Sequence, residues 1–463
     1  MKRRPNRTIF ALSTTYGQSA IAVYRISGKA CKAIAYNLCK IKKIKERFAY
    51  YSNIFDLDGK LIDRGLIIFF KAPKSYTGED VLEIHTHGST AIINKLTQVI
   101  SKIKNTRVAQ PGEFSKRAFL NGKGDLLFFE GINNLIKSET ENQRLIANKQ
   151  IDGENSLKCE LWREKILDIL AFIDAEIEFG DDIECPDIKK IQNGLHEISK
   201  EIKEVFESFD SVRNLVHGSN LLIIGPTNAG KSSFFNLLIQ DNKMIVSPVK
   251  GTTTDQLKQA IEINGKKVNL IDTAGIRDGK GKVEKIGVAK TLESINTHNK
   301  IIIVLSPDSI DSPDFKKIEK VFNNLDRKNC IVIFNKIDLK NAKKKIQEWK
   351  QKISKIKNMK SITISCKKPV NKINMLNKCY KFIDRNLLSV DTNNDDHYFS
   401  ELRHKESLKN VLFNLESAVK NISSFEISAK YLRDAMNDLD ELYGRHNEED
   451  KLEIIFNNFC IGK

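Results

Sequence analysis

The feature of this sequence that most constrains its fold is a phosphate-binding loop near the middle of the chain. The apolar run Leu221–Ile224 leads directly into Gly225-Pro-Thr-Asn-Ala-Gly230-Lys231-Ser232, which has the pattern GxxxxGK[ST]. In such a loop the glycines let backbone amides turn toward a phosphate, the lysine reaches the β- and γ-phosphates, and the serine hydroxyl binds Mg²⁺. A strand, this loop and a helix in succession predict a doubly wound α/β domain that binds a nucleoside triphosphate.

Four further motifs follow the loop in the order that GTPases have. They are GTTTD at 251–255, DTAG at 272–275, NKID at 335–338 and SCK at 365–367. The Asp338 carboxylate can accept two hydrogen bonds from the N1 and N2 edge of guanine, which adenine cannot offer, so this residue is expected to select the base. Five motifs in this order predict a GTPase.

The residues expected to contact GTP all lie in or beside these motifs. They are Asn228, Ala229, Gly230, Lys231, Ser232, Ser233, Ser247, Pro248, Val249, Lys250, Gly251, Thr252, Thr253, Asp272, Thr273, Ala274, Gly275, Asn335, Lys336, Asp338, Ser365, Cys366 and Lys367. Ser232 and Thr253 are expected to bind Mg²⁺, with Asp272 nearby.

The means of hydrolysis differs from that of Ras-like proteins. The position after DTAG, where those proteins carry a glutamine that orients water, is Ile276. Glu284, shortly after, is the predicted catalytic carboxylate, and a solvated switch residue is the alternative. In a group of GTPases that this sequence resembles, an asparagine at the position of Asn228 binds K⁺, which supplies positive charge. That resemblance implies that Ser247, Val249 and Thr252 complete the K⁺ site.

The chain as a whole is predicted to be multidomain, α/β plus all-α. Residues 1–120 read as a mixed α/β domain, with strands near Ile21–Arg25, Gly65–Phe70 and Val81–His85 and a helix near Ala91–Lys104. Residues 121–216 and 381–463 have helical periodicity, whereas residues 217–380 alternate strands and helices. A Ras-like doubly wound P-loop GTPase domain is therefore expected to be inserted into a helical bundle that its two flanking segments form together.

The positive charge of the chain is concentrated at one end. Residues 1–120 carry 22 Lys and Arg against 8 Asp and Glu, whereas the other 343 residues carry 54 against 51. A local surplus indicates an anionic partner, with nucleic acid the first candidate, and a general richness in lysine is the alternative. Replacing Lys42, Lys43 and Lys45 tests whether this region docks nucleic acid.

The cysteines and apolar runs indicate where the protein works. The eight cysteines include no CxxC pair, which favours a reducing cytoplasm over a disulfide framework or a zinc site. The longest apolar stretches are strand-length, far below the roughly 20 residues that span a bilayer, so no membrane association is expected. The basic N-terminus lacks the sustained apolar core of a signal peptide.

Motifs at both ends of the chain resemble one family, the MnmE/TrmE tRNA-modification GTPases. The C-terminus reads FCIGK at 459–463. Near the N-terminus the sequence contains YRISG at 24–28, SYTGED at 75–80, PGEF at 111–114 and RAFLNGK at 117–123. The resemblance covers essentially the whole chain. It departs from the family pattern at Thr254, Ser89 and Glu453, which concern details of the switch loop and the tail.

The resemblance implies a homodimer joined through N-terminal domains. The family works with an FAD-dependent partner, MnmG/GidA, in a heterotetramer. Together they add a (carboxymethyl)aminomethyl group to carbon 5 of the wobble uridine of tRNA, with a one-carbon unit from a tetrahydrofolate derivative, either 5-formyl- or 5,10-methylene-tetrahydrofolate. Residues 1–120 would then bind the folate and hold the dimer together. The positions that match the family's folate ligands are Arg25, Glu83, Lys123 and Lys463.

Two points stay open from the sequence. Cys460, near the expected folate site, is either a catalytic thiol that adds to the pyrimidine or a packing residue that holds the tail. A ribosome-assembly GTPase that binds rRNA is the main alternative function, although no GxxG loop between helices supports it. A GTPase that regulates a partner without a folate site is a second alternative.

Overall fold

The computed structural model describes residues 7–179, 188–240, 258–272, 300–311, 329–352, 358–367, 372–388, 397–445, 449–460 and 462. The chain divides into two compact units. The first unit comprises residues 1–136, 149–203 and 406–463, and the second comprises residues 137–148 and 204–405. The first unit is therefore built from three separate stretches of chain.

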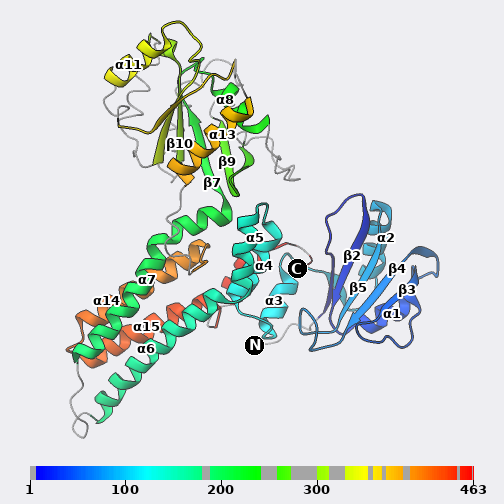
Figure 1. Ribbon diagram of the computed structural model, residues 1–463. Helices are drawn as coiled ribbons and strands as arrows, with labels where there is room; N and C mark the ends of the chain where they lie inside the picture. Colours follow the sequence, from blue (N-terminus) through cyan, green and yellow to red (C-terminus); the bar gives the residue numbers. More distant parts are fainter. Residues whose placement is uncertain are drawn as a thin grey trace, which may run out of the picture. The chain divides into compact units, whose positions relative to one another are not determined.

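The first unit contains a six-stranded sheet with one helical face (Figure 1). Its strands are β1 (Thr8–Leu12), β2 (Ser19–Ser27), β3 (Ala49–Phe55), β4 (Leu61–Phe70), β5 (Val81–Gly88) and β6 (Thr106–Val108), in the order β3-β4-β5-β2-β1-β6. Only the β1–β6 pair is parallel. Helices α1 (Cys31–Cys39) and α2 (Thr90–Ser101) share one buried apolar cluster with residues of β1 to β5. Because side chains alternate along a strand, the residues between those buried ones face the other way.

The rest of the first unit is helical. Its helices include α3 (Glu113–Leu120), α4 (Leu126–Lys137), α6 (Glu154–Phe179), α14 (Leu402–Lys420), α15 (Phe425–Tyr443) and α16 (Glu449–Asn457). Helix α6 packs against α15, and Arg163 Nε lies 3.0 Å from Asp440 Oδ1 between them. The Trp162 indole also donates to the carboxylate of Glu201, on the first part of α7 (Ile188–His217), at 2.9 Å. Helices that precede and follow the α/β segment therefore form one bundle, as the periodicity predicts.

The second unit contains the doubly wound sheet. Its strands are β7 (Ser219–Ile224), β8 (Lys258–Ile263), β9 (Lys266–Asp272), β10 (Lys300–Leu305), β11 (Cys330–Phe334) and β12 (Ser361–Thr363), in the order β12-β11-β10-β7-β9-β8. All neighbours are parallel except the β8–β9 hairpin, which turns at Asn264 and Gly265, both with positive φ. An Asn-Gly pair favours this kind of tight turn.

Helices cover both faces of this sheet (Figure 1), and an apolar cluster lies on each face. Helices α8 (Lys231–Gln240) and α13 (Lys372–Ile383) pack with η4 (Asp384–Leu388) on one face. Helix α11 (Ala342–Lys352) and η2 (Pro307–Asp311) cover the other, where Trp349 is fully buried. The strands are consequently near-continuous apolar runs, as buried parallel strands are. The predicted fold class, α/β plus all-α, is confirmed.

Helix α5 (Glu141–Ile151) connects segments of the two units along the chain. Among the described residues, no helix combines the length and apolar character required to cross a membrane.

Candidate functional site

The phosphate-binding loop has the backbone shape that its glycines predict. It joins β7 to α8, and Gly225 and Gly230 have φ angles of 151° and 91°, which disfavour other residues. A Cβ atom on Gly225 would lie 2.1 Å from the carbonyl oxygen of Val304, and one on Gly230 would lie 2.2 Å from the amide nitrogen of Asn335. Both glycines are therefore required by close packing as well as by backbone conformation.

Lys231 lies folded over this loop. Its side chain is buried, and Nζ donates to the carbonyl oxygens of Gly225 at 3.0 Å and Pro226 at 2.8 Å. The ammonium group is thus held beside the loop, where phosphate oxygens can replace the two carbonyls as acceptors. Ser232 and Ser233 follow in the first turn of α8 and are exposed. The N-terminus of a helix favours an anion because its free amides and dipole point there.

Asn335 connects three of the predicted motifs. Its amide Nδ2 donates to the carbonyl of Ala229 at 3.1 Å, and its Oδ1 accepts from the backbone amides of Lys336 at 2.8 Å and Cys366 at 3.1 Å. The side chain is 2% exposed. The sequence placed Asn335 among the GTP contacts, but its spacing gave no sign that it also braces the phosphate loop.

The predicted base pocket is formed by Asp338 and the SCK motif. Ser365 Oγ donates to Asp338 Oδ1 at 2.5 Å, which fixes the carboxylate that is expected to read guanine. Burial raises the pKa of the Cys366 thiol to about 12, so the thiol stays neutral beside it. Lys336 has a φ of 60°, and Lys367 is exposed. The structure therefore brings the P-loop, NKID and SCK motifs together at the same end of the sheet.

Several predicted residues lie outside the described part of the chain. They are Ser247, Pro248, Val249, Lys250, Gly251, Thr252, Thr253, Thr273, Ala274, Gly275, Glu284 and Lys463. The backbone of Asp272 ends β9, but its side chain is not described. Within the described ranges, no group of three or more His, Cys, Asp or Glu side chains is arranged to hold a metal ion. Ser232 and Asn228 are the predicted metal ligands that the structure does place.

A second predicted site lies on the first unit's sheet, on the face opposite α1 and α2. Arg25 on β2 pairs in register with Glu83 on β5, and its Nε and Nη2 donate to Glu83 Oε1 at 3.1 and 3.0 Å. His85 Nε2 lies 3.3 Å from the other carboxylate oxygen. The hydrogen bond from His85 and the charge of Arg25 hold the pKa of Glu83 below its usual range, against the opposing effect of burial. Sequence reasoning did not identify His85.

Aromatic and C-terminal groups surround this pair. The Arg25 guanidinium lies 5.3 Å from the centre of the Tyr76 ring, and its Nη1 donates to the carbonyl of Gly462 at 3.1 Å. Ser13 Oγ donates to the same carbonyl at 3.1 Å. A Cβ on Gly78 would lie 3.2 Å from Lys123 Cε, which places Lys123 beside the SYTGED turn. Of the four predicted folate ligands, Arg25 and Glu83 are in contact.

Cys460 does not pack through its side chain. The thiol is exposed, whereas the neighbouring Phe459 is 8% exposed. The carbonyl oxygen of Cys460 accepts from the amide of Gly112 at 3.4 Å. The tail is therefore held by Phe459 and by backbone contacts, and the interpretation of Cys460 as a packing residue is not supported for its thiol.

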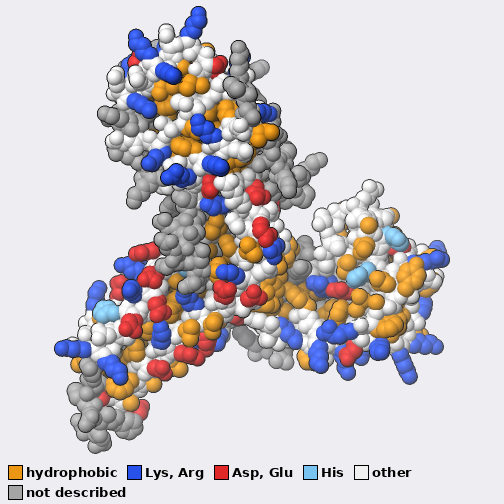
Figure 2. Space-filling model, in the orientation of Figure 1, with side chains coloured by type: hydrophobic (Ala, Val, Ile, Leu, Met, Phe, Trp, Pro, Cys, Tyr) orange, Lys and Arg blue, Asp and Glu red, His pale blue; other side chains and the backbone are white. Residues whose placement is uncertain are grey.

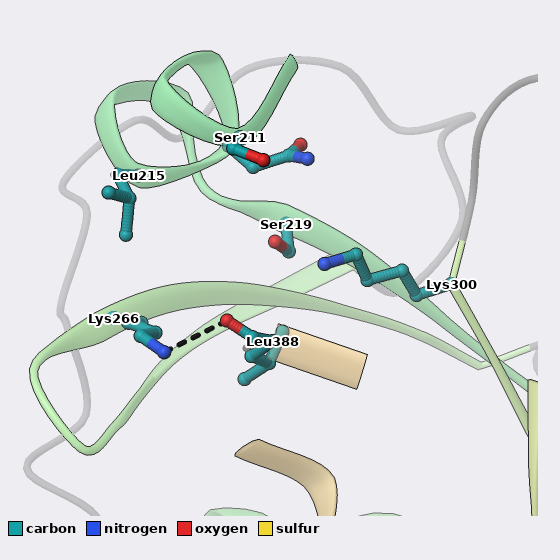
Figure 3. Close-up of a pocket in the computed structure, with 7 residues that line it drawn as sticks. Ser211, Leu215, Ser219, Lys266, Lys300 and Leu388 are labelled. Atoms are coloured by element: carbon teal, nitrogen blue, oxygen red, sulfur yellow. Dashed lines mark hydrogen bonds between the residues drawn. The ribbon is translucent and has the colours of Figure 1, made fainter. Parts of the chain in front are cut away.

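A small pocket of the second unit lies away from the nucleotide motifs (Figure 3). It is lined by residues at the end of α7, the starts of β7 and β10, the β8–β9 hairpin and the end of η4: Ser211, Asn214, Leu215, Ser219, Lys266, Lys300 and Leu388. Lys266 donates to the Leu388 carbonyl at 2.8 Å. Burial and then the charge of Lys266 lower the pKa of Lys300. The phosphate loop follows the other end of β7, so this pocket is not the nucleotide site.

Two family models match the chain. A model described as the GTP-binding protein TrmE N-terminus matches residues 8–123, and one described as the MnmE helical domain matches residues 126–460. The tRNA modification GTPase MnmE of Aquifex aeolicus (strain VF5) is 34% identical over 464 residues, which cover 98% of this chain and 99% of that protein. The tRNA modification GTPase MnmE of Pelagibacter ubique (strain HTCC1062) is 39% identical over 461 residues, which cover 98% and 100%.

Proposed function

The chain belongs to the MnmE/TrmE family of tRNA modification GTPases, and on this premise we propose that it is a K⁺-activated GTP hydrolase that modifies the wobble uridine of tRNA. It acts with an FAD-dependent MnmG/GidA partner, adds a (carboxymethyl)aminomethyl group to carbon 5, and takes the one-carbon unit from a tetrahydrofolate. The observation that carries this proposal is the similarity to such GTPases along the whole chain, from the P-loop unit to both chain ends.

Mass spectrometry of tRNA tests this proposal directly. In a strain that lacks this protein, the wobble uridine of its target tRNAs loses the modification, and the intact chain restores it. A ribosome-assembly GTPase predicts unchanged tRNA and altered ribosomal subunits instead. The proposal is contradicted if the tRNA is fully modified in the strain that lacks the chain. It is also contradicted if the modification is lost there and the intact chain does not restore it.

The described residues divide the work of binding GTP. We propose that Lys231 and the amides at the start of α8 hold the phosphates and that Ser232 binds Mg²⁺, as the serine does in such loops. Asp338, whose carboxylate accepts a hydrogen bond from Ser365, is proposed to accept hydrogen bonds from guanine. Asn335 keeps the phosphate loop and the base pocket in one arrangement. Mg²⁺ held by Ser232 would neutralise charge on the phosphates during hydrolysis.

The K⁺ proposal depends on Asn228. This residue has a φ of 60° and an exposed side chain at the tip of the phosphate loop, so its amide oxygen can reach a cation beside the phosphates. The remaining ligands proposed are Ser247, Val249 and Thr252, and Glu284 is proposed to arrange the attacking water. Hydrolysis should be faster in K⁺ than in Na⁺ buffer and should lose this preference in Asn228→Ala. Equal rates of GTP hydrolysis in both buffers would exclude activation by K⁺. A Glu284→Ala variant that hydrolyses GTP at the parent rate would exclude the proposed role of Glu284.

The folate proposal rests on Glu83 and Arg25. The carboxylate is ionised and, although Arg25 and His85 contact it, each oxygen keeps a lone pair that can accept from the amidine-like edge of a pterin. Lys123 and Lys463 are proposed to meet the anionic glutamate tail. Calorimetric titration with 5-formyltetrahydrofolate should show binding that Glu83→Gln weakens about tenfold or more. Absence of binding to the parent chain removes this part of the proposal.

The exposed thiol of Cys460 is compatible with a catalytic role, which we propose for it beside the folate site. A Cys460→Ser variant should then retain GTP hydrolysis and folate binding but lose tRNA modification. Full modification by this variant excludes the role. A homodimer joined through the N-terminal domains, and action in the cytoplasm, complete the proposal. Sedimentation of the purified chain as a monomer at micromolar concentration contradicts the dimer.

A further inference from the structure

A cluster of cations lies along one edge of the first unit's sheet, outside the sites described above. Its members are exposed and come from α1, the α1–β3 connection and the turn after β4: Lys32, Lys40, Lys42, Lys43, Lys45, Arg47, Lys71 and Lys74. We call this cluster the basic edge. Figure 2 shows Lys and Arg side chains gathered on the side of the domain where Figure 1 places α1 and β3.

Contacts across elements hold the segments of the basic edge together at the end of β4. The Arg47 guanidinium lies 5.6 Å from the centre of the Phe70 ring and donates through Nη2 to the carbonyl of Lys74 at 2.8 Å. Lys32 Nζ lies 5.6 Å from the centre of the neighbouring Phe69 ring. The α1–β3 connection is therefore fixed against the end of β4, and cations from three segments meet there.

The charge of the basic edge is not neutralised within the described residues. None of its eight side chains forms an ion pair there, whereas the ion-paired cations of the same domain lie elsewhere, at Arg25, Lys95, Arg107 and Arg117. The first 55 residues contain twelve Lys and Arg and a single acidic residue, Glu46. Like charges gathered in this way repel one another, and an anionic partner relieves that repulsion.

One exposed aromatic ring lies beside a cation of the basic edge, and a second lies on the neighbouring edge strand. Phe48 is 50% exposed, and Lys45 Nζ lies 5.9 Å from the centre of its ring. Tyr51, on edge strand β3, is 74% exposed. Proteins that bind single-stranded or looped RNA combine cations for the backbone with exposed rings on which bases stack. This combination favours RNA over an acidic protein surface, which has no bases to stack.

We propose that the basic edge binds the phosphate backbone of tRNA, with Phe48 and Tyr51 available to stack on unpaired bases. This inference rests on the proposed function in tRNA modification and assigns tRNA a place on the chain. The surface lies on α1 and the β3 edge, while Arg25 and Glu83 lie on inner strands of the same sheet. A tRNA held at this edge is thus bound by the same domain that is proposed to hold the folate.

The test compares two matched lysine pairs at opposite edges of one sheet. Lys43→Ala/Lys45→Ala removes charge from the basic edge, beside β3. Lys102→Ala/Lys104→Ala removes the same charge beside β6, the other edge strand, about 24 Å away across five strand spacings. Affinity of the full-length chain for fluorescently labelled tRNA is measured by anisotropy between about 50 and about 200 mM salt. All four lysines are exposed, so melting temperatures should match the parent.

The proposal expects the basic-edge pair to lower tRNA affinity about tenfold at low salt. It also expects the slope of log affinity against log salt to fall by about 2, with the control pair near the parent. Equal losses in both pairs, or no loss in either, overturn the basic edge as the docking site. A loss of binding to the MnmG/GidA partner with unchanged tRNA affinity overturns it in favour of a protein interface. GTP turnover and 5-formyltetrahydrofolate binding, measured on the same variants, report separately on the proposed function.

Discussion

The pKa values of two partly buried carboxylates of the first unit, Glu83 and Asp438, are shifted in opposite directions by their surroundings. Glu83 is surrounded by Arg25 and His85, and its pKa is lowered. Asp438 on α15 accepts a hydrogen bond from Asn414 at 2.8 Å, but burial and the charge of Glu441 raise its pKa to about 6. At neutral pH both are ionised, but within the described ranges only Glu83 forms an ion pair, with Arg25, that compensates its desolvation. Asp438 therefore carries an electrostatic cost that its hydrogen bond with Asn414 relieves only in part.

Replacing Asp438 with Asn should stabilise the first unit at pH 7. A raised folded-state pKa means that the folded state binds the proton of Asp438 more tightly than the unfolded state does. The stability that this proton contributes is fully present below the unfolded-state pKa and is lost as pH rises through about 6. Asparagine keeps the acceptor oxygen and removes the charge. We expect a gain of about 1 kcal/mol at pH 7, after allowing for partial exposure, that disappears near pH 4.

Urea unfolding followed by fluorescence measures this difference. The chain has two tryptophans, Trp162 in the first unit and Trp349 in the second. A Trp349→Phe background leaves Trp162 as the only reporter of the unit that contains Asp438. Asp434→Asn, on the same helix, is a useful comparison because it removes a neighbouring charge but leaves the Asp438 carboxylate. A gain that is constant from pH 4 to pH 8 contradicts the titration of Asp438.

At the scale of elements, the sequence predicts what local patterns encode and misses what distant strands bring together. The β7–loop–α8 unit and the β8–β9 hairpin follow from GxxxxGKS and from Asn264-Gly265, because their signals lie within a few residues. Edge strand β3 was not predicted, because polar residues interrupt its apolar alternation. The register that sets Arg25 opposite Glu83 joins residues 58 positions apart, and no local pattern specifies it.

Asn335 makes another non-local connection, because its side chain joins the loops after β7, β11 and β12. Asn335→Ala removes the hydrogen-bond partner of three backbone groups: the carbonyl of Ala229 and the amides of Lys336 and Cys366. Asn335 is only 2% exposed, so water does not readily replace it. We expect the second unit to lose about 2–3 kcal/mol of stability and to bind fluorescent GDP at least about tenfold more weakly. Trp349, in a Trp162→Phe background, reports the unfolding.

Asn335→Asp separates the hydrogen bond that Asn335 donates from the two that it accepts. Aspartate keeps acceptors for the amides of Lys336 and Cys366, but it cannot donate to the Ala229 carbonyl and repels it. It should therefore preserve the base pocket while loosening the phosphate loop, with part of the stability loss. If Asn335→Ala unfolds at the same urea concentration as the parent, Asn335 does not brace these loops.

At the scale of the molecule, each unit has apolar clusters of its own, and the chain's last helix belongs to the first. Leu452, Phe456 and Phe459 are buried with Leu126 and Phe129, more than 300 residues earlier. A Cβ on Gly112 would lie 2.1 Å from the carbonyl of Phe456, which shows how closely the tail packs on the loop before α3. The domain that is proposed to bind folate and tRNA is therefore completed by residues synthesised after the GTPase unit.

A pair of substitutions on α16 tests whether this helix stabilises the first unit without affecting the second. Phe456 is 1% exposed and Ile454 is 68% exposed on the same helix. Phe456→Ala should destabilise the first unit by about 3–5 kcal/mol, because it leaves a cavity among aromatic rings, whereas Ile454→Ala should change stability by less than about 0.5 kcal/mol. Trp162 fluorescence should report the loss, while Trp349 unfolding and GDP affinity stay at the parent values because the nucleotide motifs share no cluster with Phe456. Equal losses at both tryptophans would show that the two units unfold as one, and the tail would then stabilise the GTPase unit as well.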